Sequence, residues 1–279
     1  SVRGVDTWLR SNLTHSELVT VGGFPSFDTD GFTVGVGSGR WNGSGDPYVA
    51  WNWKAGGTAV SNTNGTITSS VSANPAAGFS IVSWTSDGTN NTLGHGLALA
   101  PEIIITKRRD STGNWVSATT AIDGGMDRLW LNLTSAATSE STQAFTATTI
   151  TNWNNSNGST QIAYAFHSVE SYSKVGSYTG NGSADGPFVH CGFRPAYVMV
   201  KVTNVTDSWF INDNKRDSYN VVDEQLKANS SDAEATNRGL DFVSNGFKIR
   251  DSSTSHNASG NTYIFLAFAE SPFKHSNAR

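Results

Sequence analysis

Internal repetition is the feature that most constrains what this chain can fold into. The segment Trp84–Trp115 returns 94 positions later as Tyr178–Trp209. Within that register Lys107 corresponds to Lys201, and one glycine and one proline also coincide. A pattern of apolar and turn residues that recurs at constant spacing forms the same structural unit each time. The chain is therefore expected to consist of tandem copies of one module.

A second repeat places the last part of this module at the start of the chain. Residues Phe27–Trp53 match Phe242–Phe268 at a distance of 215 positions, and Gln161–Phe166 is the middle copy of the final strand. Only half a module therefore precedes the complete copies. A half module leaves one face of its sheet uncovered, so either the chain is cut from a longer protein or a neighbouring chain covers that face.

These matches predict a division into five parts. Residues 1–57 form the C-terminal half of a first β-module, 58–77 a linker, 78–172 and 173–272 two complete β-sandwich modules, and 273–279 a tail. The linker is assigned because Gly, Thr, Ser, Asn and Ala make up most of residues 56–77, a composition typical of flexible connections.

Alternating hydrophobicity assigns strands, not helices, to the modules. Val49, Trp51 and Trp53 fall on one side of an extended chain, which is the period-two pattern of a β-strand. Short β-branched or aromatic runs bounded by Gly, Asn, Asp or Pro recur throughout the chain. Only residues 222–237 could form a turn or two of helix. The predicted fold class is all-β, with tandem β-sandwich modules of roughly 95 residues, the first one incomplete.

The composition excludes several classes of function. Charged residues make up only 15% of the chain and the net charge is -4, so the clustered Lys and Arg that nucleic-acid binding requires are lacking. The longest apolar run, Tyr263–Ala269, is far shorter than the roughly 20 residues that span a bilayer. Cys191 is the only cysteine, so an intrachain disulfide is impossible.

Enzyme signatures are also lacking, and no catalytic residue, cofactor or metal is predicted. The sequence contains no His-Glu-x-x-His, Cys-x-x-Cys, Walker or Gly-x-Ser-x-Gly motif. Residues 181–186 copy the oxygen spacing of the first half of a Ca²⁺ loop, but Gly192 stands where the bidentate Glu is expected. A turn between strands explains that pattern better.

Three polar loops, each just before the last strand of a module, are the candidate binding sites. Each has a planar ring followed by an asparagine: Trp41 and Asn42, Trp153 and Asn154, His256 and Asn257. An exposed ring offers a flat face to a sugar, and the neighbouring amide can bind hydroxyls. The loops are therefore hypothetical glycan or inter-subunit contacts. The alternative is that each ring folds back and caps its own sandwich.

One stretch of the repeat resembles a known family. GSYTGNGSADGPF at 176–188, GFRPAYVMVK at 192–201 and YVAWNWKAGG at 48–57 are similar to repeats in large structural proteins of tailed phages, especially podoviruses and cyanophages. The resemblance covers essentially the whole chain. In that family the repeats often lie near lectin-like β-sandwich domains, which implies a tail-fibre or virion-surface location and assembly as a homotrimer with other virion proteins.

The sequence thus predicts a non-enzymatic virion structural protein, a tail fibre or surface appendage that adheres to host-surface polysaccharide. The closest alternative is a head-decoration or fibre protein with a purely architectural role. A secreted protein that binds or hydrolyses carbohydrate is the third possibility.

Overall fold

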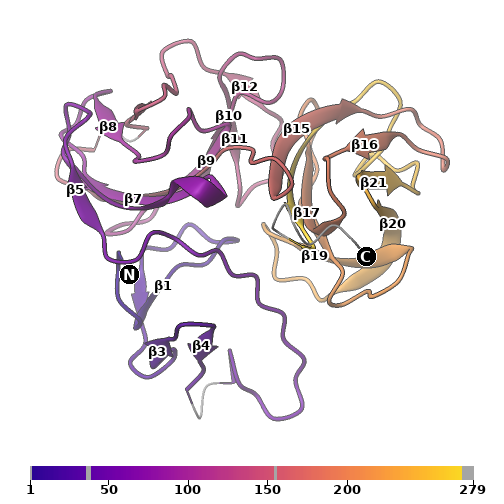
Figure 1. Cartoon of the computed structure of the whole chain (residues 1–279), viewed down its shortest axis with the longest axis horizontal. Coiled ribbons are helices and arrows are strands. Elements are labelled where there is room, and N and C mark those ends of the chain that lie inside the picture. The colour runs from indigo at the N-terminus through magenta and orange to yellow at the C-terminus, as the bar shows by residue number, and fades with distance from the viewer. Residues whose placement is uncertain (1, 36–38, 154–155, 272–279) are drawn as a thin grey trace.

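The computed structural model describes residues 2–35, 39–153 and 156–271. Figure 1 shows three lobes around a common centre: residues 2–57 in the lower lobe, the first complete module at the upper left and the second at the right. Apart from one short 3-10 turn, η1 (Pro75–Ala77), every element of the described residues is a β-strand. The predicted all-β class is confirmed.

The first complete module is built on an eight-stranded sheet with the order β12-β11-β10-β9-β14-β7-β6-β5. Its strands are β5 (Val60–Asn62), β6 (Ser69–Asn74), β7 (Phe79–Thr85), β9 (Ile103–Arg108), β10 (Val116–Thr119), β11 (Asp127–Trp130), β12 (Thr138–Ser139) and β14 (Thr160–Phe166). A separate two-stranded sheet joins β8 (Thr92–Gly94) to β13 (Thr149–Thr151).

The second module repeats the central part of this plan. Its eight-stranded sheet has the order β15-β22-β17-β18-β19-β20-β21-β16. The strands are β15 (Ser173–Thr179), β16 (Phe188–His190), β17 (Pro195–Val202), β18 (Trp209–Asp213), β19 (Val222–Lys227), β20 (Ala235–Val243), β21 (Gly246–Ile249) and β22 (Thr262–Ala269). In the first module β14 lies between β7 and β9, and in the second its repeat equivalent β22 lies between β15 and β17. The two sheets differ at their ends: β6 and β5 extend the first sheet beyond β7, whereas β21 and β16 extend the second beyond β20.

Two sequence predictions are wrong. Residues 58–77 are not a linker, because β5, β6 and η1 lie there and β6 pairs with β7 along five residues, from Ser70↔Ser83 to Asn74↔Phe79. Residues 222–237 form β19, the start of β20 and the turn between them instead of helix. Pairing with neighbouring strands outweighs local propensity in both places.

Residues 2–57 contain two short hairpins whose registers recur in the complete modules. In β1 (Thr7–Trp8) and β2 (Leu18–Val19), Thr7 pairs with Val19, as Asp127 pairs with Ser139 120 positions later. The second hairpin joins β3 (Ser26–Phe27) to β4 (Phe32–Thr33). There Phe27 pairs with Phe32, as Phe242 pairs with Phe247 in β20 and β21.

Each complete module has its own apolar interior, and a third cluster lies between the lobes. The interior of the first module includes Val82, Ile104 and Ala163. That of the second includes Val198, Phe242 and Phe265. The third cluster, which we call the shared core, combines the opposite faces of the two large sheets and takes in Trp51 and Trp53 from the lower lobe.

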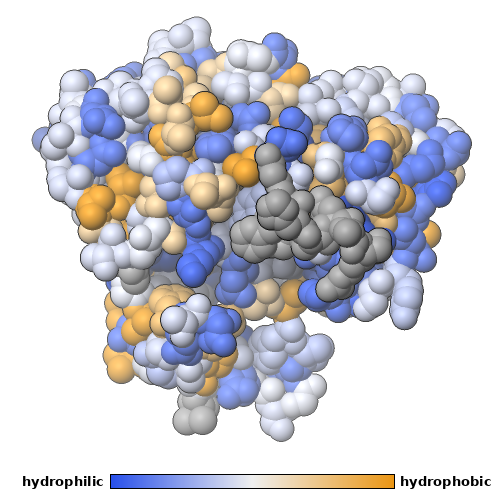
Figure 2. Space-filling model, in the orientation of Figure 1, coloured by the Kyte–Doolittle hydropathy of each residue, from blue (hydrophilic) through white to orange (hydrophobic). Residues whose placement is uncertain are grey.

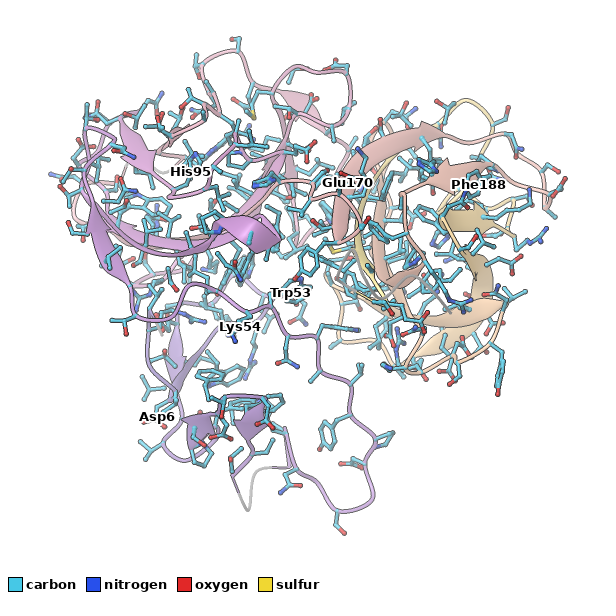
Figure 3. All side chains as sticks on the ribbon, viewed as in Figure 1. Asp6, Trp53, Lys54, His95, Glu170 and Phe188 are labelled. Atoms are coloured by element: carbon cyan, nitrogen blue, oxygen red, sulfur yellow. The ribbon has the colours of Figure 1, made fainter. Side chains whose placement is uncertain are left out.

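Three repeat-equivalent rings meet in the shared core: Trp53, Phe166 and Phe268. The ring centroids of Trp53 lie 6.3 Å from Phe166 and 5.4 Å from Phe268, and those of Phe166 and Phe268 lie 5.9 Å apart. Trp53 is labelled between the lobes in Figure 3. The same side chain position of one repeated strand therefore holds all three lobes together.

Candidate functional site

The Trp41 loop packs inward onto the lower lobe. The half-buried Trp41 ring stands edge-on to Trp8, with centroids 5.1 Å apart, and is tilted against Phe24 at 5.0 Å. A Cβ on Gly23 would lie 2.5 Å from the Trp41 ring, so only glycine permits this approach. Asn42 is exposed, and its amide donates a hydrogen bond to the Gly35 carbonyl at 3.4 Å. A ligand could therefore reach the Asn42 side chain more easily than the Trp41 ring.

Trp153 is half-buried and packs against the interior of the first module. Its indole N–H is shielded from solvent and has no hydrogen-bond partner among the described residues. Its predicted neighbour Asn154 lies outside the described residues. The ring at 153 therefore contributes mainly to the module's interior.

The expectation of an exposed ring and amide at 256 and 257 is wrong. Both His256 and Asn257 are 0% exposed. The His256 ring lies against Phe210, with centroids 5.1 Å apart. Burial lowers the pKa of His256, although the nearby Asp251 carboxylate acts in the opposite direction. These two residues offer no surface to a glycan.

Asn257 instead fastens the loop that follows β15. Its amide donates to Asn181 Oδ1 at 2.9 Å and to the Ser183 carbonyl at 2.6 Å, and its own oxygen accepts from the Asn181 N–H at 2.7 Å. These bonds close the loop that resembled part of a Ca²⁺ site. Among the described residues there is no group of three or more His, Cys, Asp and Glu side chains that could hold a metal ion.

In the first module Asn152 holds the equivalent loop in the same way, although the sequence did not single this residue out. We call Asn152 and Asn257 the asparagine clamps. Asn152 is buried, and its amide donates to the Thr89 carbonyl at 2.8 Å, where Thr89 is the repeat equivalent of Ser183. Its oxygen accepts from Trp84 Nε1 at 3.1 Å. The signal in the sequence is an asparagine beside an aromatic ring, but the ring follows Asn152 whereas it precedes Asn257.

A groove of about 970 Å³ separates the lower lobe from the first module. Aromatic and aliphatic groups line its walls, among them Trp51, Trp53 and Ile81, and Asp28 and Lys54 contribute charge. The Tyr164 hydroxyl also lies here and accepts a hydrogen bond from Arg3 at 3.2 Å. The groove therefore combines apolar surface with hydrogen-bonding groups.

An ion-pair network fixes the N-terminal residues beside this groove. Glu17 pairs with Arg3 at 3.3 Å and with Arg109 at 2.5 Å. Burial alone would raise the pKa of Glu17, but the hydrogen bonds from Arg109 and Thr7 and the charges of both arginines outweigh burial and lower it. Glu17 is thus held as a carboxylate that joins the lower lobe to the first module.

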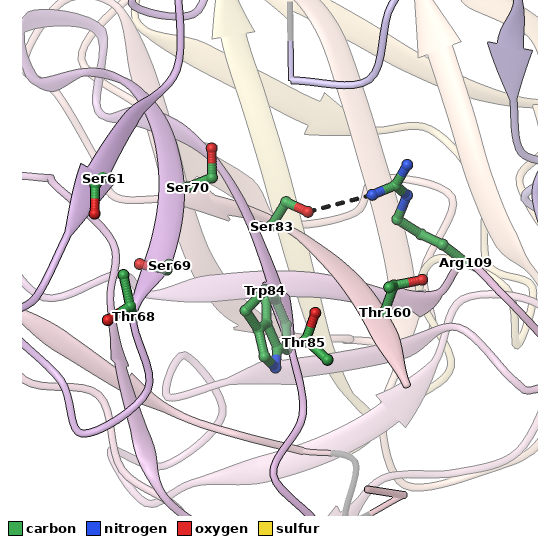
Figure 4. Close-up of a pocket in the computed structure, with 9 residues that line it drawn as sticks. All are labelled: Ser61, Thr68, Ser69, Ser70, Ser83, Trp84, Thr85, Arg109 and Thr160. Carbon is green, nitrogen blue, oxygen red and sulfur yellow. Dashed lines mark hydrogen bonds between the residues drawn. The ribbon is translucent and has the colours of Figure 1, made fainter. Parts of the chain in front are cut away.

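A second, shallower hollow of about 380 Å³ lies on β5, β6, β7 and β14 and is shown in Figure 4. Hydroxyl groups form a row across three adjacent strands, because Ser61 pairs with Ser70 and Ser70 pairs with Ser83. Neighbouring strands lie about 4.8 Å apart, so the row has a regular spacing. Arg109 Nη1 donates to Ser83 Oγ at 3.4 Å. We call this surface the hydroxyl face.

The hydroxyl face was not predicted, although its signal is present in the sequence. Hydroxyl residues flank a single apolar residue in Ser83–Thr85 and in Ser70–Ser72, which is the period-two pattern of a strand. Figure 2 shows that hydrophilic and neutral residues dominate the visible surface, with apolar residues in separate groups. Such a surface suits hydrogen bonding to neutral polar partners.

No helix among the described residues is long and apolar enough to cross a membrane.

Comparison with known proteins gives one match. Residues 1–272 match a family described as a domain of unknown function, DUF7483. No curated protein and no solved structure matches the chain. Because the match covers nearly the whole sequence and all three lobes, the chain belongs to the DUF7483 family.

Proposed function

We propose that this chain is a non-enzymatic structural protein of a virion surface appendage, such as a tail fibre, and that it adheres to host-surface polysaccharide. The observation that carries the proposal is the hydroxyl face, where Ser61, Ser70 and Ser83 stand in register on adjacent strands. A row of hydroxyls on a rigid sheet can donate to and accept from the hydroxyls of a saccharide chain. Thr85 and Thr160, which pair with each other two residues further along β7 and β14, add two more hydroxyls beside this row.

The shared core supports the structural part of the proposal. Trp53, Phe166 and Phe268 join three lobes through one set of ring contacts, so the lobes resist relative movement. An appendage that presents a binding surface needs such stiffness. The sequence resemblance to tailed-phage repeats supports the location on a virion surface.

Adsorption to host-envelope polysaccharide, measured together with release of soluble oligosaccharide, tests the adhesion. Ser61→Val and Ser70→Val together remove two hydroxyls at exposed positions and keep β propensity. We expect this double variant to adsorb at least several-fold more weakly. Thr138→Val, on the opposite edge strand of the same sheet, is the matched control and should adsorb normally.

The outcomes separate the three candidate functions. Adsorption without cleavage that depends on the two serines supports the proposal. Lack of adsorption would favour a purely architectural role in a fibre or head decoration, and released oligosaccharide would favour a carbohydrate-degrading protein. Assembly as a homotrimer with other virion proteins belongs to the same proposal, and a stable monomer in sedimentation equilibrium would contradict that part.

A further inference from the structure

The structure builds one loop twice, in the lower lobe and in the second module. The Tyr48 hydroxyl accepts from the Gly43 N–H at 2.8 Å, and 215 positions later the Tyr263 hydroxyl accepts from the Ala258 N–H at 2.8 Å. The two hydroxyls also donate to equivalent carbonyls, those of Gly39 at 3.3 Å and Thr254 at 2.7 Å. The loops therefore have the same local fold.

The surroundings of these two loops differ. Tyr263 is 0% exposed, whereas Tyr48 is 51% exposed. Asn257 is completely buried, whereas its repeat equivalent Asn42 is exposed. Because local folding is the same, the difference arises from what lies over the loop.

In the second module β15 and the loop after it supply the cover. The Tyr178 ring of β15 is stacked on Tyr263, with centroids 4.9 Å apart and planes 10° apart. Asn257 holds the following loop through the Ser183 carbonyl. No described residue stands in the corresponding place over Tyr48, since the chain's copies of this strand are β7 and β15 and each pairs within its own module.

Residues 48–55 have the burial pattern of a strand. Exposure alternates along them: Tyr48, Ala50, Asn52 and Lys54 are exposed, and the residues between are half-buried. The half-buried side packs into the shared core through Trp51 and Trp53. Within the described part of the chain, this segment makes no backbone ladder with another strand. An extended segment with free N–H and C=O groups is a template for an added strand.

We propose that residues 48–53 bind a β-strand of this same repeat, with the pattern of β15 and of the loop that follows it. The register follows from the second module, where Tyr178 pairs with Tyr263 and Gly176 with Phe265. The incoming strand is antiparallel and places its aromatic ring over Tyr48 and a glycine opposite Ala50. Asn42 then holds a carbonyl of the loop after that strand, as Asn257 does.

The two complete modules show the same features that we expect of this strand: an aromatic ring on the strand and an asparagine that holds the loop after it. In the first module Trp84 of β7 occupies the position of Tyr178, and Asn152 holds the next loop. The exposed face of 48–53 corresponds to the side that faces the interior of the second module, where Tyr263, Phe265 and Ala267 are buried. A covering strand with an aromatic side chain and a following glycine-containing loop thus occupies the edge of residues 48–53 that β15 occupies on β22. This inference does not depend on the proposed function.

A tethered copy of the strand tests the inference. Residues 172–186 are copied onto the N-terminus of the full chain through a flexible Gly/Ser linker, which raises the effective concentration of the copy to the millimolar range. We expect amide hydrogen exchange of residues 48–53 to slow by about tenfold or more. Sedimentation should show that the extended chain has the same oligomeric state as the parent chain.

Two controls make the result specific. A linker carrying the same residues in scrambled order should leave exchange at 48–53 unchanged, and Asn42→Ala in the chain should reduce the protection given by the native copy. Equal exchange with native and scrambled copies would overturn the inference. Protection of 48–53 that appears in the unextended chain as its concentration rises would also overturn it, because a second copy of the chain would then cover the segment.

Discussion

Lys107 of β9 and Lys201 of β17 are repeat equivalents, and both ammonium groups donate to the carbonyl of the next residue in the chain. The distances are 2.7 Å to Arg108 and 2.6 Å to Val202. Lys107 is 1% exposed and Lys201 is 0% exposed. Burial of the charged group lowers the pKa of each lysine to about 8.

These lysines predict a rise in stability as the pH increases from 8 to 9. Below pH 8 the folded and unfolded chains both hold the two protons, whereas above it the folded chain releases them and the unfolded chain does not. The gain is about 1 kcal/mol per lysine over that interval. Urea unfolding at both pH values measures it. Within the same interval the unfolded Cys191 thiol begins to ionise and reduces the gain by less than about 1 kcal/mol, since burial raises the pKa of the folded thiol to about 12.

The variant with Lys107→Met and Lys201→Met provides the control. We expect it to be at least as stable as the parent chain at pH 7, because methionine fills the same space without a buried charge. Its stability should no longer rise between pH 8 and 9. A rise that persists in the double variant would assign the pH dependence to other groups.

Trp53→Ala is expected to lower the free energy of unfolding by about 2 to 4 kcal/mol. The substitution leaves a cavity among the rings of Phe166 and Phe268 in the shared core. Urea denaturation measures the loss, and Trp53→Phe, which keeps a ring, should lose much less. A loss below about 0.5 kcal/mol for Trp53→Ala would show that the ring does not join the lobes energetically.

The asparagine clamps can be compared directly. Asn152→Ala and Asn257→Ala each leave buried polar groups of the clamped loop without partners, so each should cost about 1 to 3 kcal/mol. Asn42→Ala changes the equivalent but exposed residue and should cost less than about 0.5 kcal/mol. Thermal unfolding of the three variants checks this order. An Asn42 variant as unstable as the other two would contradict it.

Cys191 is expected to resist thiol reagents in the folded chain. The thiol is 7% exposed, and burial raises its pKa to about 12, so almost none of it is thiolate at pH 8. Reaction with a chromogenic disulfide reagent should be slow in buffer and complete within minutes in urea. Rapid reaction of the folded chain would place the thiol at the surface.

Much of the fold follows from two sequence patterns. Short β-branched or aromatic runs predicted strands and not helices, and the match of Trp84–Trp115 to Tyr178–Trp209 predicted equivalent units around Lys107 and Lys201. The strands that hold these lysines, β9 and β17, do take the same place beside β14 and β22. Residues 58–77 were assigned to a linker because serine and threonine are typical of loops. In β6, however, Ser69 and Ser72 are buried, and their hydroxyls donate to the carbonyls of Gly94 and Gly57.

The candidate site could be predicted only in part, because exposure depends on distant contacts. The polar neighbours of His256 and Asn257 suggest a surface loop, yet Asn257 binds Asn181 and Ser183, which lie 76 and 74 positions away in the chain. Asn42, in the equivalent sequence context, is exposed. Local sequence therefore identified the loop correctly but did not determine whether another segment lies over it.

The ring triangle of Trp53, Phe166 and Phe268 has an evolutionary consequence. A larger ring at one of these positions can be accommodated only if another becomes smaller, because all three fill one space. Across DUF7483 sequences the three positions should therefore covary in volume, although they lie in three separate copies of the repeat. Duplicated strands that began as identical copies would by this means have diverged together, each constrained by the other two.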